Sequence, residues 1–262
     1  MAALTPLPSG ATPRQTATGE HQAPAGPAAD VAQRIAFAGD SLADNYWSGI
    51  TRLVAADACL KNIVELGRFA RNGTGLTRGD RVYWPREIRR IGDTFKPDLL
   101  IISIGLNDRQ FIVDANGART AWGAPNWTDK YRHEVSEFIK GAVASNAPVL
   151  LLGLPAMRDS VDNEDVIEKG RIFAEVVAQF GAANVHYIEP WRLHAEGTDT
   201  FSSYGPGKNG RMVQIRTQDG QHFTTAGEDL LAAYLFPKII AALSAVETRI
   251  GQCPSWKEAQ QH

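Results

Sequence analysis

Asp219 and His222 lie three residues apart in the segment RTQDGQHFTTAG, just ahead of a stretch with helical periodicity. A carboxylate and an imidazole at this spacing can serve as two metal ligands or as a catalytic acid–base pair, and they can equally belong to an ordinary polar loop. The segment alone does not distinguish these three roles. The chemistry therefore depends on which other groups the fold brings to the same place.

A serine stands at the junction between a predicted strand and a predicted helix in the segment FAGDSLADNYW. At this junction Ser41 can expose its hydroxyl at the edge of a sheet, where the positive end of the helix faces any anion that forms. Ser41 therefore occupies a position suited to a nucleophile. Its alternative role is to cap the helix, which is common for serine at such a place.

Two further segments carry hydrogen-bond donors that can stabilise an oxyanion. SIGLNDRQ ends a predicted strand, where Gly105 allows a ligand to approach the backbone closely and the Asn107 amide offers an N–H group. ARNGTGLTRGD forms a glycine-rich loop after another predicted strand, and its backbone N–H groups can line the same pocket. An Asx turn at Asn107 and a plain flexible turn in the glycine-rich loop are the alternative interpretations.

The elements that must position these residues follow an alternation of short apolar runs and longer amphipathic segments, which is typical of a parallel sheet with crossover helices. Pro85 suits the first turn of its predicted helix, and Thr128 and Thr225 are the predicted N-caps of two others. The predicted strands are 34–38, 62–67, 98–104, 149–153 and 185–188, and the predicted helices are 42–57, 85–94, 128–145, 163–180 and 225–248.

The carboxyl ends of parallel strands meet at one edge of a sheet, so Ser41, Asn107, the glycine-rich loop and the acid–base pair are expected to converge there. Two long predicted loops, 109–127 and 190–218, also follow strands and lie at that edge. Together these segments supply a nucleophile, a base, a residue that orients the base, and oxyanion donors. These are the groups that acyl transfer requires.

The order and spacing of these segments resemble the SGNH (GDSL-type) family of serine hydrolases over nearly the whole predicted domain. The matching blocks are GDSL at 39–42, a block II glycine at Gly75, GxND at 105–108 and DxxH at 219–222. Gly73 lies close enough to compete with Gly75 for the block II position. The stretches GTGLTRGDRVYWPREI, GAPNWTDKY and DGQHFTTAG further resemble a bacterial subgroup that is often described as a domain of unknown function and is commonly exported.

The resemblance implies an α/β fold, a three-layer α/β/α sandwich with a five-stranded parallel sheet of the flavodoxin-like kind. It also implies that Ser41 is the nucleophile, that His222 acts as general base and then as general acid, and that Asp219 orients the imidazole. The implied oxyanion hole consists of the Ser41 and Gly75 backbone N–H groups and the Asn107 side chain.

These roles predict a carboxylic ester hydrolase that works through an acyl-enzyme at Ser41 and needs no metal ion or organic cofactor. Glycine- and serine-rich loops favour small acyl groups, so acetyl and aryl esters, with carbohydrate O-acetyl esters among them, are the expected substrates. One alternative is a catalytically silent SGNH-like domain that binds carbohydrate or acts as a scaffold. Another is a metal-dependent hydrolase in which Asp40 or Asp108 completes a site with the acid–base pair.

The long predicted loops and the flanks of the motifs carry the candidate substrate contacts. Their aromatic residues can form an acyl or aryl pocket or a stacking platform for a sugar, or they can pin the loops to the core. Arg78, Arg109 and Arg216 can contact an anionic substrate, or they can form salt bridges with nearby aspartates. The predicted substrate-binding residues are Trp122, Trp127, Trp191 and Arg216; the other loop aromatics are Phe111, Phe201 and Tyr204; the nearby aspartates are Asp80, Asp108 and Asp219.

Composition argues against two classes of partner. Lysine and arginine (27) nearly balance aspartate and glutamate (29), so the chain has no basic excess with which to bind nucleic acid. The longest apolar runs, 99–104 and 149–154, fall well short of the roughly 20 residues that span a bilayer. A small-molecule or carbohydrate ester is therefore the expected partner, and the sequence leaves the oligomeric state open.

The chain has two cysteines, Cys59 and Cys253, and neither has neighbours that would complete a zinc site. The helices predicted over 42–57 and 225–248 both start at the edge that carries the motifs and run away from it, and one cysteine follows each. We therefore predict a disulfide between the two, which favours an oxidising compartment.

The predicted organisation is a disordered or linker segment over 1–33, one domain over 34–250 and a C-terminal tail over 251–262. The first segment holds five of the fourteen prolines and shows no apolar periodicity. It has neither the charged start nor the apolar core of a secretory signal. The protein is thus expected to be either cytoplasmic or exported with its signal removed, and the predicted disulfide and the exported subgroup favour a periplasmic or secreted location.

Overall fold

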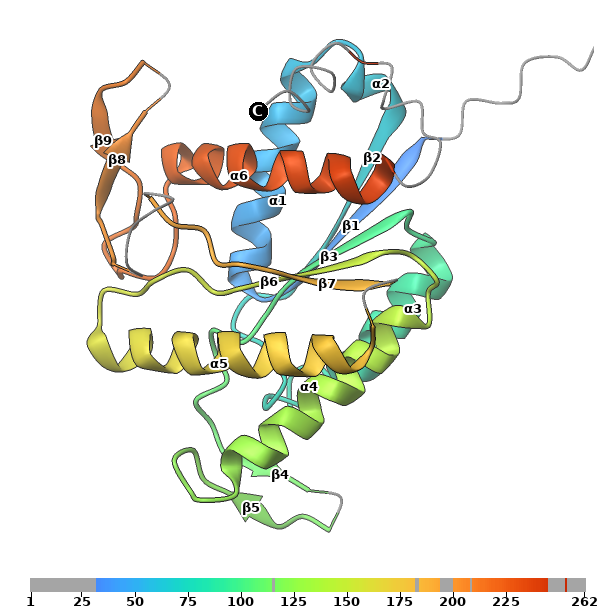
Figure 1. The fold of residues 1–262 in the computed structure, drawn as a ribbon, viewed down its shortest axis with the longest axis vertical. Helices are drawn as coiled ribbons and strands as arrows, with labels where there is room; N and C mark the ends of the chain where they lie inside the picture. The colour runs from blue at the N-terminus through green and yellow to red at the C-terminus, as the bar shows by residue number, and fades with distance from the viewer. Residues whose placement is uncertain are drawn as a thin grey trace, which may run out of the picture. The chain divides into compact units, whose positions relative to one another are not determined.

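A central sheet of five parallel strands organises the fold (Figure 1). The structure is a computed structural model that describes residues 32–114, 116–181, 184–193, 200–207, 209–244 and 253. The strands are β1 (Gln33–Gly39), β2 (Val64–Ala70), β3 (Leu99–Ser103), β6 (Val149–Leu152) and β7 (Val185–Ile188), in the spatial order β2-β1-β3-β6-β7. Every residue of β3 and β6 is buried, because helices cover both faces of the sheet, and this explains their continuous apolar sequences.

Helices form the two outer layers. On one face lie α1 (Ser41–Ala56) and α6 (Thr225–Ser244); on the other lie α3 (Trp84–Phe95), α4 (Trp127–Val143) and α5 (Ser160–Gln179), while the short α2 (Leu60–Ile63) leads into β2 (Figure 1). Leu42, Tyr46 and Ile50 of α1 are buried at a spacing of four residues, which marks one face of a helix. The predicted three-layer α/β/α sandwich with a five-stranded parallel sheet is confirmed, and its strand order is the flavodoxin-like one.

The register of the sheet brings three loops together at its carboxyl edge. Gly39, the last residue of β1, pairs with Ala70 of β2 and with Ser103 of β3. Gly39 has a φ of +134°, and a Cβ atom there would lie 1.8 Å from the Ser103 carbonyl oxygen. Only glycine fits this position, so the chain can cross the end of β3 closely as it enters α1.

Two short antiparallel hairpins lie in the long loops, and the sequence pattern does not predict them. β4 (Ile112–Val113) pairs with β5 (Arg119–Thr120), and β8 (Tyr204–Pro206) pairs with β9 (Met212–Gln214). Ladders of two or three residues offer too little alternation of apolar and polar side chains to be recognised in a sequence.

The helix starts test three predictions. Pro85 lies in the first turn of α3, as predicted. Thr128 is not an N-cap, because α4 begins at Trp127, one residue earlier. Thr225 is the first residue of α6 rather than its cap, and the hydroxyl of the preceding Thr224 accepts a hydrogen bond from the Gly227 N–H at 3.3 Å. Apolar periodicity locates a helix but does not fix its end to a single residue.

Cys59, which lies just before α2, and Cys253 are joined by a disulfide bond. The described residues, all of which follow residue 31, form one compact unit. None of the helices in this part of the chain is long and apolar enough to cross a membrane. Residue 33 belongs to β1, while the rest of the predicted linker up to residue 31, and the predicted tail apart from Cys253, lie outside the described residues.

Candidate active site

Ser41, His222 and Asp219 form a continuous chain of hydrogen-bonded side chains. Ser41 Oγ lies 2.6 Å from His222 Nε2, and His222 Nδ1 lies 2.8 Å from Asp219 Oδ2. Ser41 begins α1 and the other two residues precede α6, so segments 181 residues apart in sequence meet here. The His222 side chain is 31% exposed, which leaves the site open to small molecules from solvent.

Asp40 holds the start of α1 and frees Ser41 from capping it. Asp40 Oδ1 accepts the Leu42 N–H at 3.0 Å, so Asp40 is the N-cap and the capping role suggested for Ser41 is excluded. Asp40 Oδ2 accepts the N–H groups of Gly105 and Leu106 at 3.0 and 2.9 Å. Burial raises the pKa of Asp40 to about 7, and these N–H donors offset part of the rise. One buried carboxyl thus ties the Ser41 loop to the loop after β3.

The Asp219 carboxylate is held by its own loop. Its Oδ1 accepts hydrogen bonds from the Thr217 hydroxyl at 2.6 Å and from the Gln221 N–H at 2.8 Å. The His222 backbone N–H donates to the same oxygen at 3.0 Å. Partial burial raises the pKa of Asp219, but these hydrogen bonds outweigh burial and hold the pKa well below its usual range. An ionised Asp219 favours a proton on His222 Nδ1, which leaves Nε2 to accept the proton of Ser41.

Arg216 supports this loop from within the protein. The residue is 2% exposed, its Nη1 donates to the Ala156 carbonyl at 2.9 Å, and its Nη2 donates to the Gln221 carbonyl at 2.8 Å. The guanidinium also lies over the Phe223 ring, 4.2 Å from its centroid. Burial lowers the pKa of Arg216 to about 10, so it remains charged at neutral pH. The prediction that Arg216 contacts substrate is wrong, because its guanidinium faces carbonyl groups of the protein.

Asn107 lies beside the glycine-rich loop that follows β2. Its Nδ2 donates to the Thr74 carbonyl at 2.9 Å, so the amide binds another segment rather than closing an Asx turn. This bond uses one of the two amide N–H groups and brings the side chain next to Gly75, which follows Thr74. A Cβ atom at Gly75 would lie 2.0 Å from Asp108 Oδ1, so only glycine fits there. Gly73 has a φ of +72°, so both candidate block II positions favour glycine.

The two buried carboxylates of which either one would complete the metal-site alternative are engaged by protein donors. Asp108 accepts the Thr77 N–H at 3.0 Å and the Tyr131 hydroxyl at 2.9 Å, while Asp40 accepts the three backbone N–H groups described above. Within the part of the chain that the structure describes, no group of three or more His, Cys, Asp and Glu side chains is arranged to hold a metal ion. The donor set of the metal-dependent alternative is therefore not assembled at the acid–base pair.

A second buried cation, Lys169 of α5, holds the loop after β3. Lys169 and Asp165 are 1% and 5% exposed and form an ion pair of 2.6 Å. Lys169 Nζ also donates to the Gly105 carbonyl at 2.8 Å, two residues before Asn107. Lys169 is a functional candidate that sequence reasoning missed. Its only signal is an Asp and a Lys four residues apart on a predicted helix, which is usually a solvated surface pair.

Two of the predicted substrate contacts pin loops to the core instead. Trp127 is 3% exposed, and its Nε1 donates to the Gln110 carbonyl at 2.8 Å. Trp191 is 9% exposed and packs edge-on against Phe223. Both predictions are wrong for this reason. Trp122 differs from them, because 39% of it is exposed.

The arginines near the motifs form ion pairs or stacking contacts. Arg78 pairs with Asp80 at 3.1 Å, as the salt-bridge alternative predicts. Arg109 pairs with Asp162, which is not one of the aspartates that the sequence suggested as partners. The Arg109 guanidinium also lies 4.7 Å from the centroid of the Trp122 ring. The second oxygen of Asp162 accepts the Gln221 side-chain amide at 2.9 Å. The first turn of α5 therefore bridges the loop after Asn107 and the loop that carries His222.

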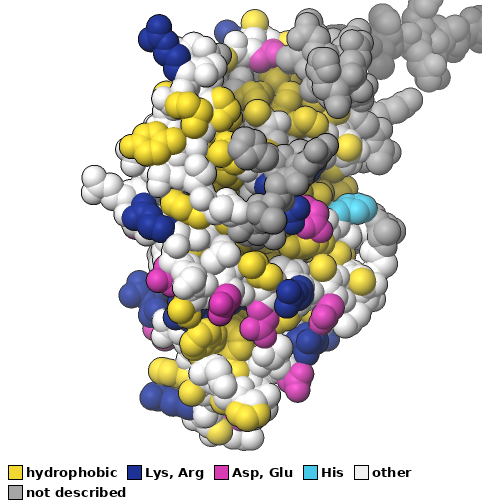
Figure 2. Space-filling model, turned by 60° about the vertical axis from the view of Figure 1, so that its left-hand side comes forward, with side chains coloured by type: hydrophobic (Ala, Val, Ile, Leu, Met, Phe, Trp, Pro, Cys, Tyr) yellow, Lys and Arg dark blue, Asp and Glu magenta, His cyan; other side chains and the backbone are white. Residues whose placement is uncertain are grey.

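Charge on the visible face of the molecule is mixed. Figure 2 shows basic and acidic side chains interspersed, with apolar groups between them and no continuous patch of either sign on this face. This distribution agrees with the near balance of charged residues in the sequence.

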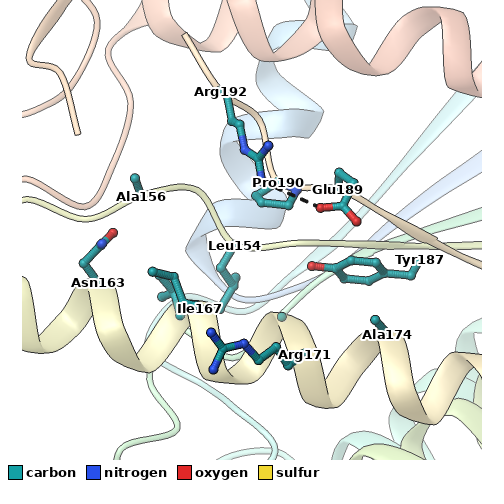
Figure 3. Close-up of a pocket in the computed structure, with 12 residues that line it drawn as sticks. Leu154, Ala156, Asn163, Ile167, Arg171, Ala174, Tyr187, Glu189, Pro190 and Arg192 are labelled. Carbon is teal, nitrogen blue, oxygen red and sulfur yellow. Dashed lines mark ion pairs between the residues drawn. The ribbon is translucent and has the colours of Figure 1, made fainter. Parts of the chain in front are cut away.

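A separate cavity of about 290 Å³ lies between α5 and the ends of β6 and β7 (Figure 3). Leu154 and Ile167 line it, and the Glu189–Arg192 ion pair of 3.9 Å stands at its upper side in the view of Figure 3. Neither Ser41 nor any other member of the hydrogen-bonded triad lines this cavity. An ester carbonyl bound at Ser41 would not occupy it.

Comparison with known proteins gives a family and a fold. A sequence-family model described as "Protein of unknown function (DUF459)" matches residues 34–238. No curated protein matches the sequence.

Several solved structures share the fold at low sequence identity. An acetyl esterase mutant solved with an acetate ion aligns at 15% identity and a TM-score of 0.54 over 82% of this chain and 99% of its own. A carbohydrate esterase family 3 protein from Talaromyces cellulolyticus aligns at 16% identity and a TM-score of 0.53, over 82% of this chain and 99% of its own. An acetyl xylan esterase aligns at 17% identity and a TM-score of 0.51, over 79% of this chain and 99% of its own. These similarities establish a shared fold.

Proposed function

The chain belongs to the DUF459 family, and on this basis and that of its site geometry we propose that it is a serine esterase of the SGNH (GDSL) type. Its proposed substrates are carboxylic esters with small acyl groups, and its proposed nucleophile is Ser41. The observation that carries this proposal is the unbroken relay from Ser41 Oγ through the His222 ring to the Asp219 carboxylate, at 2.6 and 2.8 Å. Such a relay is the arrangement that activates a serine for acyl transfer.

The first half of the reaction forms an acyl-enzyme. His222 Nε2 takes the proton from Ser41 Oγ as the oxygen attacks the ester carbonyl carbon, and the carbonyl oxygen becomes an oxyanion. The proposed donors to this oxyanion are the Ser41 and Gly75 backbone N–H groups and the Asn107 amide N–H that Thr74 does not use. When the tetrahedral intermediate collapses, protonated His222 gives its proton to the leaving alcohol.

Water completes the reaction. His222 Nε2 removes a proton from a water molecule that attacks the acyl carbonyl, which forms the second tetrahedral intermediate. When the bond between the acyl carbon and Ser41 Oγ breaks, protonated His222 gives this proton to Ser41 Oγ and the carboxylic acid leaves. Asp219 stays ionised throughout, holds Nδ1–H in place and stabilises the positive charge on the imidazole. Every proton is accounted for by these three side chains and water.

The fold relatives support the proposed substrate class. An acetyl esterase, a carbohydrate esterase and an acetyl xylan esterase share this fold. Two exposed rings of the long loops, Phe111 and Trp122, lie against the guanidinium groups of Arg119 and Arg109, so charged groups interrupt the apolar surface there. A short acyl group on a sugar or an aryl alcohol is the substrate type that suits both observations.

The test is turnover of p-nitrophenyl esters of graded acyl length, together with labelling by a fluorophosphonate. We expect acetate to be the best substrate and the label to be found on Ser41 by peptide mass spectrometry. Ser41→Ala should lose both properties and keep its melting temperature. Near-normal turnover by Ser41→Ala, or a folded wild-type protein that neither turns over nor becomes labelled, would overturn the proposal; the latter result would favour the silent binding domain.

We also propose that the protein works outside the cytoplasm, in the periplasm or as a secreted protein. The Cys59–Cys253 disulfide supports this, because such bonds persist mainly in oxidising compartments. Fractionation of producing cells, with thiol labelling of each fraction, tests it. A pool that is wholly cytoplasmic, with both thiols reduced, would contradict the proposal.

A further inference from the structure

A groove of about 910 Å³ lies outside the triad and takes no part in the mechanism above. Its walls are residues 76–80, residues 110–114 and one face of α4 around Glu134. The groove is far larger than an acetyl group needs, and its volume falls in the range of roughly 300–1,000 Å³ that is typical of sites for whole ligands. A small acyl group therefore does not account for it.

Two of the walls continue directly from the proposed oxyanion donors. Residues 76–80 follow Gly75, and residues 110–114 begin three residues after Asn107. Hydrogen bonds join the two walls at their base: Asn107 Nδ2 to the Thr74 carbonyl at 2.9 Å, and the Thr77 N–H to Asp108 at 3.0 Å. The two segments that carry the proposed oxyanion donors therefore continue into two walls of the groove.

The lining combines exposed aromatic rings with charges of both signs. Tyr83 and Phe111 are 52% and 41% exposed, and the Arg119 guanidinium lies 4.5 Å from the Phe111 ring centroid. The charged residues of the lining are Arg78, Asp80, Asp114, Arg119, Glu134 and Glu137.

This combination selects among ligand types. A long acyl chain would strip water from these charged groups without replacing its hydrogen bonds, which costs free energy. A polyanion would meet the carboxylates and a polycation the guanidinium groups. An uncharged sugar chain offers hydroxyls to charges of either sign and apolar ring faces to Tyr83 and Phe111.

We propose that this groove binds the sugar chain of an uncharged, O-acylated glycan while the ester carbonyl of the glycan lies at Ser41. The inference rests on the proposed esterase function and extends it from the acyl group to the alcohol part of the substrate. Phe111 and Tyr83 are its specificity-determining residues, because their rings are exposed in the groove and are not needed to build the fold.

The first experiment compares two substrates in three variants. Phe111→Ala and Tyr83→Ala remove rings of the groove, and Tyr204→Ala removes an equally exposed ring on the β8–β9 hairpin, outside the groove. Loss of one stacking ring should raise KM for acetylated xylan about tenfold in each groove variant, which corresponds to about 1.4 kcal/mol. Turnover of p-nitrophenyl acetate should stay within about twofold of wild type, because that substrate does not reach along the groove. Tyr204→Ala should match wild type on both substrates.

The second experiment measures binding without catalysis. Ser41→Ala is titrated with xylohexaose and with an oligogalacturonate of equal length, and amide chemical shifts are followed by NMR. We expect xylohexaose to shift resonances of residues 76–80 and 110–114, to bind more tightly than the acidic oligomer, and to lose affinity when Phe111→Ala is added.

The two experiments separate the two proposals. Hydrolysis of p-nitrophenyl acetate with no saturable binding of xylohexaose at the groove overturns the glycan inference and leaves the esterase intact. Binding of xylohexaose there by a protein that hydrolyses no ester supports the groove and overturns the esterase. Equal losses on both substrates in the groove variants, or preference for the acidic oligomer or for p-nitrophenyl palmitate, contradicts the inference.

Discussion

The proposed reaction uses two loops: the acid–base loop, which carries Asp219 and His222, and the oxyanion loop after β3, which carries Gly105 and Asn107. Each is held by a buried cation, but in different ways. Arg216 supports the acid–base loop by spreading its charge over the carbonyls of Ala156 and Gln221, and it forms no ion pair among the described residues. Lys169 supports the oxyanion loop as a point charge that is shared between Asp165 and the Gly105 carbonyl. The planar guanidinium can hold two backbone segments in fixed positions, whereas a buried ammonium needs a counterion to be stable.

The difference suggests how each loop performs its task. In the proposed reaction the acid–base loop keeps an imidazole aligned while its charge changes, and Arg216, which has no ion pair among the described residues, supports this loop through carbonyl groups. In the same proposed reaction the oxyanion loop keeps the Asn107 amide fixed while negative charge develops on the ester oxygen. For that task the ion pair of Lys169 and Asp165 anchors the backbone two residues before Asn107.

The largest expected effect comes from breaking the acid–base loop at its reacting group. His222→Ala should lower kcat by about a millionfold, and Asp219→Ala by about ten-thousandfold, in line with the losses seen when a triad is dismantled. The order reflects that His222 moves the proton while Asp219 orients it. Steady-state rates with p-nitrophenyl acetate measure both, with His186→Ala, an exposed histidine on β7, as the control. A larger loss for Asp219→Ala would show that the roles are misassigned.

The next effect comes from the oxyanion loop. Asn107→Ala removes one of three proposed donors and should lower kcat by about 100- to 1,000-fold, with KM nearly unchanged. The buried supports of this loop at Asp108 and Lys169 remain, so the melting temperature should stay close to that of wild type. Asn62→Ala, at an exposed site on α2, is the control. Wild-type kcat in Asn107→Ala would remove the residue from the reaction.

A charge-deletion pair tests Lys169 as a positioning residue. Lys169→Met leaves Asp165 buried without its partner and should cost about 3–5 kcal/mol of unfolding free energy. The double variant Lys169→Met/Asp165→Leu removes both charges and should regain most of that stability. It should still show about tenfold lower kcat, because the Gly105 carbonyl has lost its charged donor. Recovery of kcat together with stability would show that Lys169 has a structural role only.

The conservative change Arg216→Lys tests the other cation with a smaller effect. An ammonium cannot donate to the carbonyls of both Ala156 and Gln221 in the geometry of the guanidinium, so one buried carbonyl loses its partner. We expect kcat and the rate of fluorophosphonate labelling to fall together by about tenfold, with unchanged KM. Arg132→Lys, on the outer surface of α4, is the matched control. Normal labelling at reduced stability would limit Arg216 to a structural role.

The groups at the carboxyl edge could be predicted from sequence because strand ends determine their position. Ser41, Asn107 and His222 each follow or precede a regular element whose pattern is clear, and the register at Gly39 then brings the loops together. The five-stranded sheet was predictable for the same reason, since buried parallel strands read as continuous apolar runs.

The buried cations and the aromatic contacts could not be predicted, because burial of a side chain depends on tertiary packing. Arg216 and Lys169 have the sequence context of surface residues, and only the fold shows that carbonyl groups surround them. Trp127 and Trp191 look like Trp122 in a loop, yet the first two face the core. Aromatic residues in an irregular segment have no periodicity from which their direction can be derived.

The smallest expected effect concerns the pH at which the acid–base loop contributes to stability. Hydrogen bonds hold the pKa of Asp219 in the folded protein below its ordinary value of 3.8. At pH values between the pKa of Asp219 in the folded protein and its ordinary pKa, the unfolded chain binds more protons than the folded protein. The stability contributed by this carboxylate is therefore fully present above about pH 4 and is lost as the pH falls further. Asp219 is half-exposed, with 47% of its side chain accessible, so the contribution is modest. Urea unfolding between about pH 2 and pH 6 should therefore show a gap between wild type and Asp219→Asn that narrows below about pH 4. Asp80→Asn, at an exposed ion pair, is the control for a surface carboxylate. A stability gap between wild type and Asp219→Asn that widens toward acid pH would contradict the prediction.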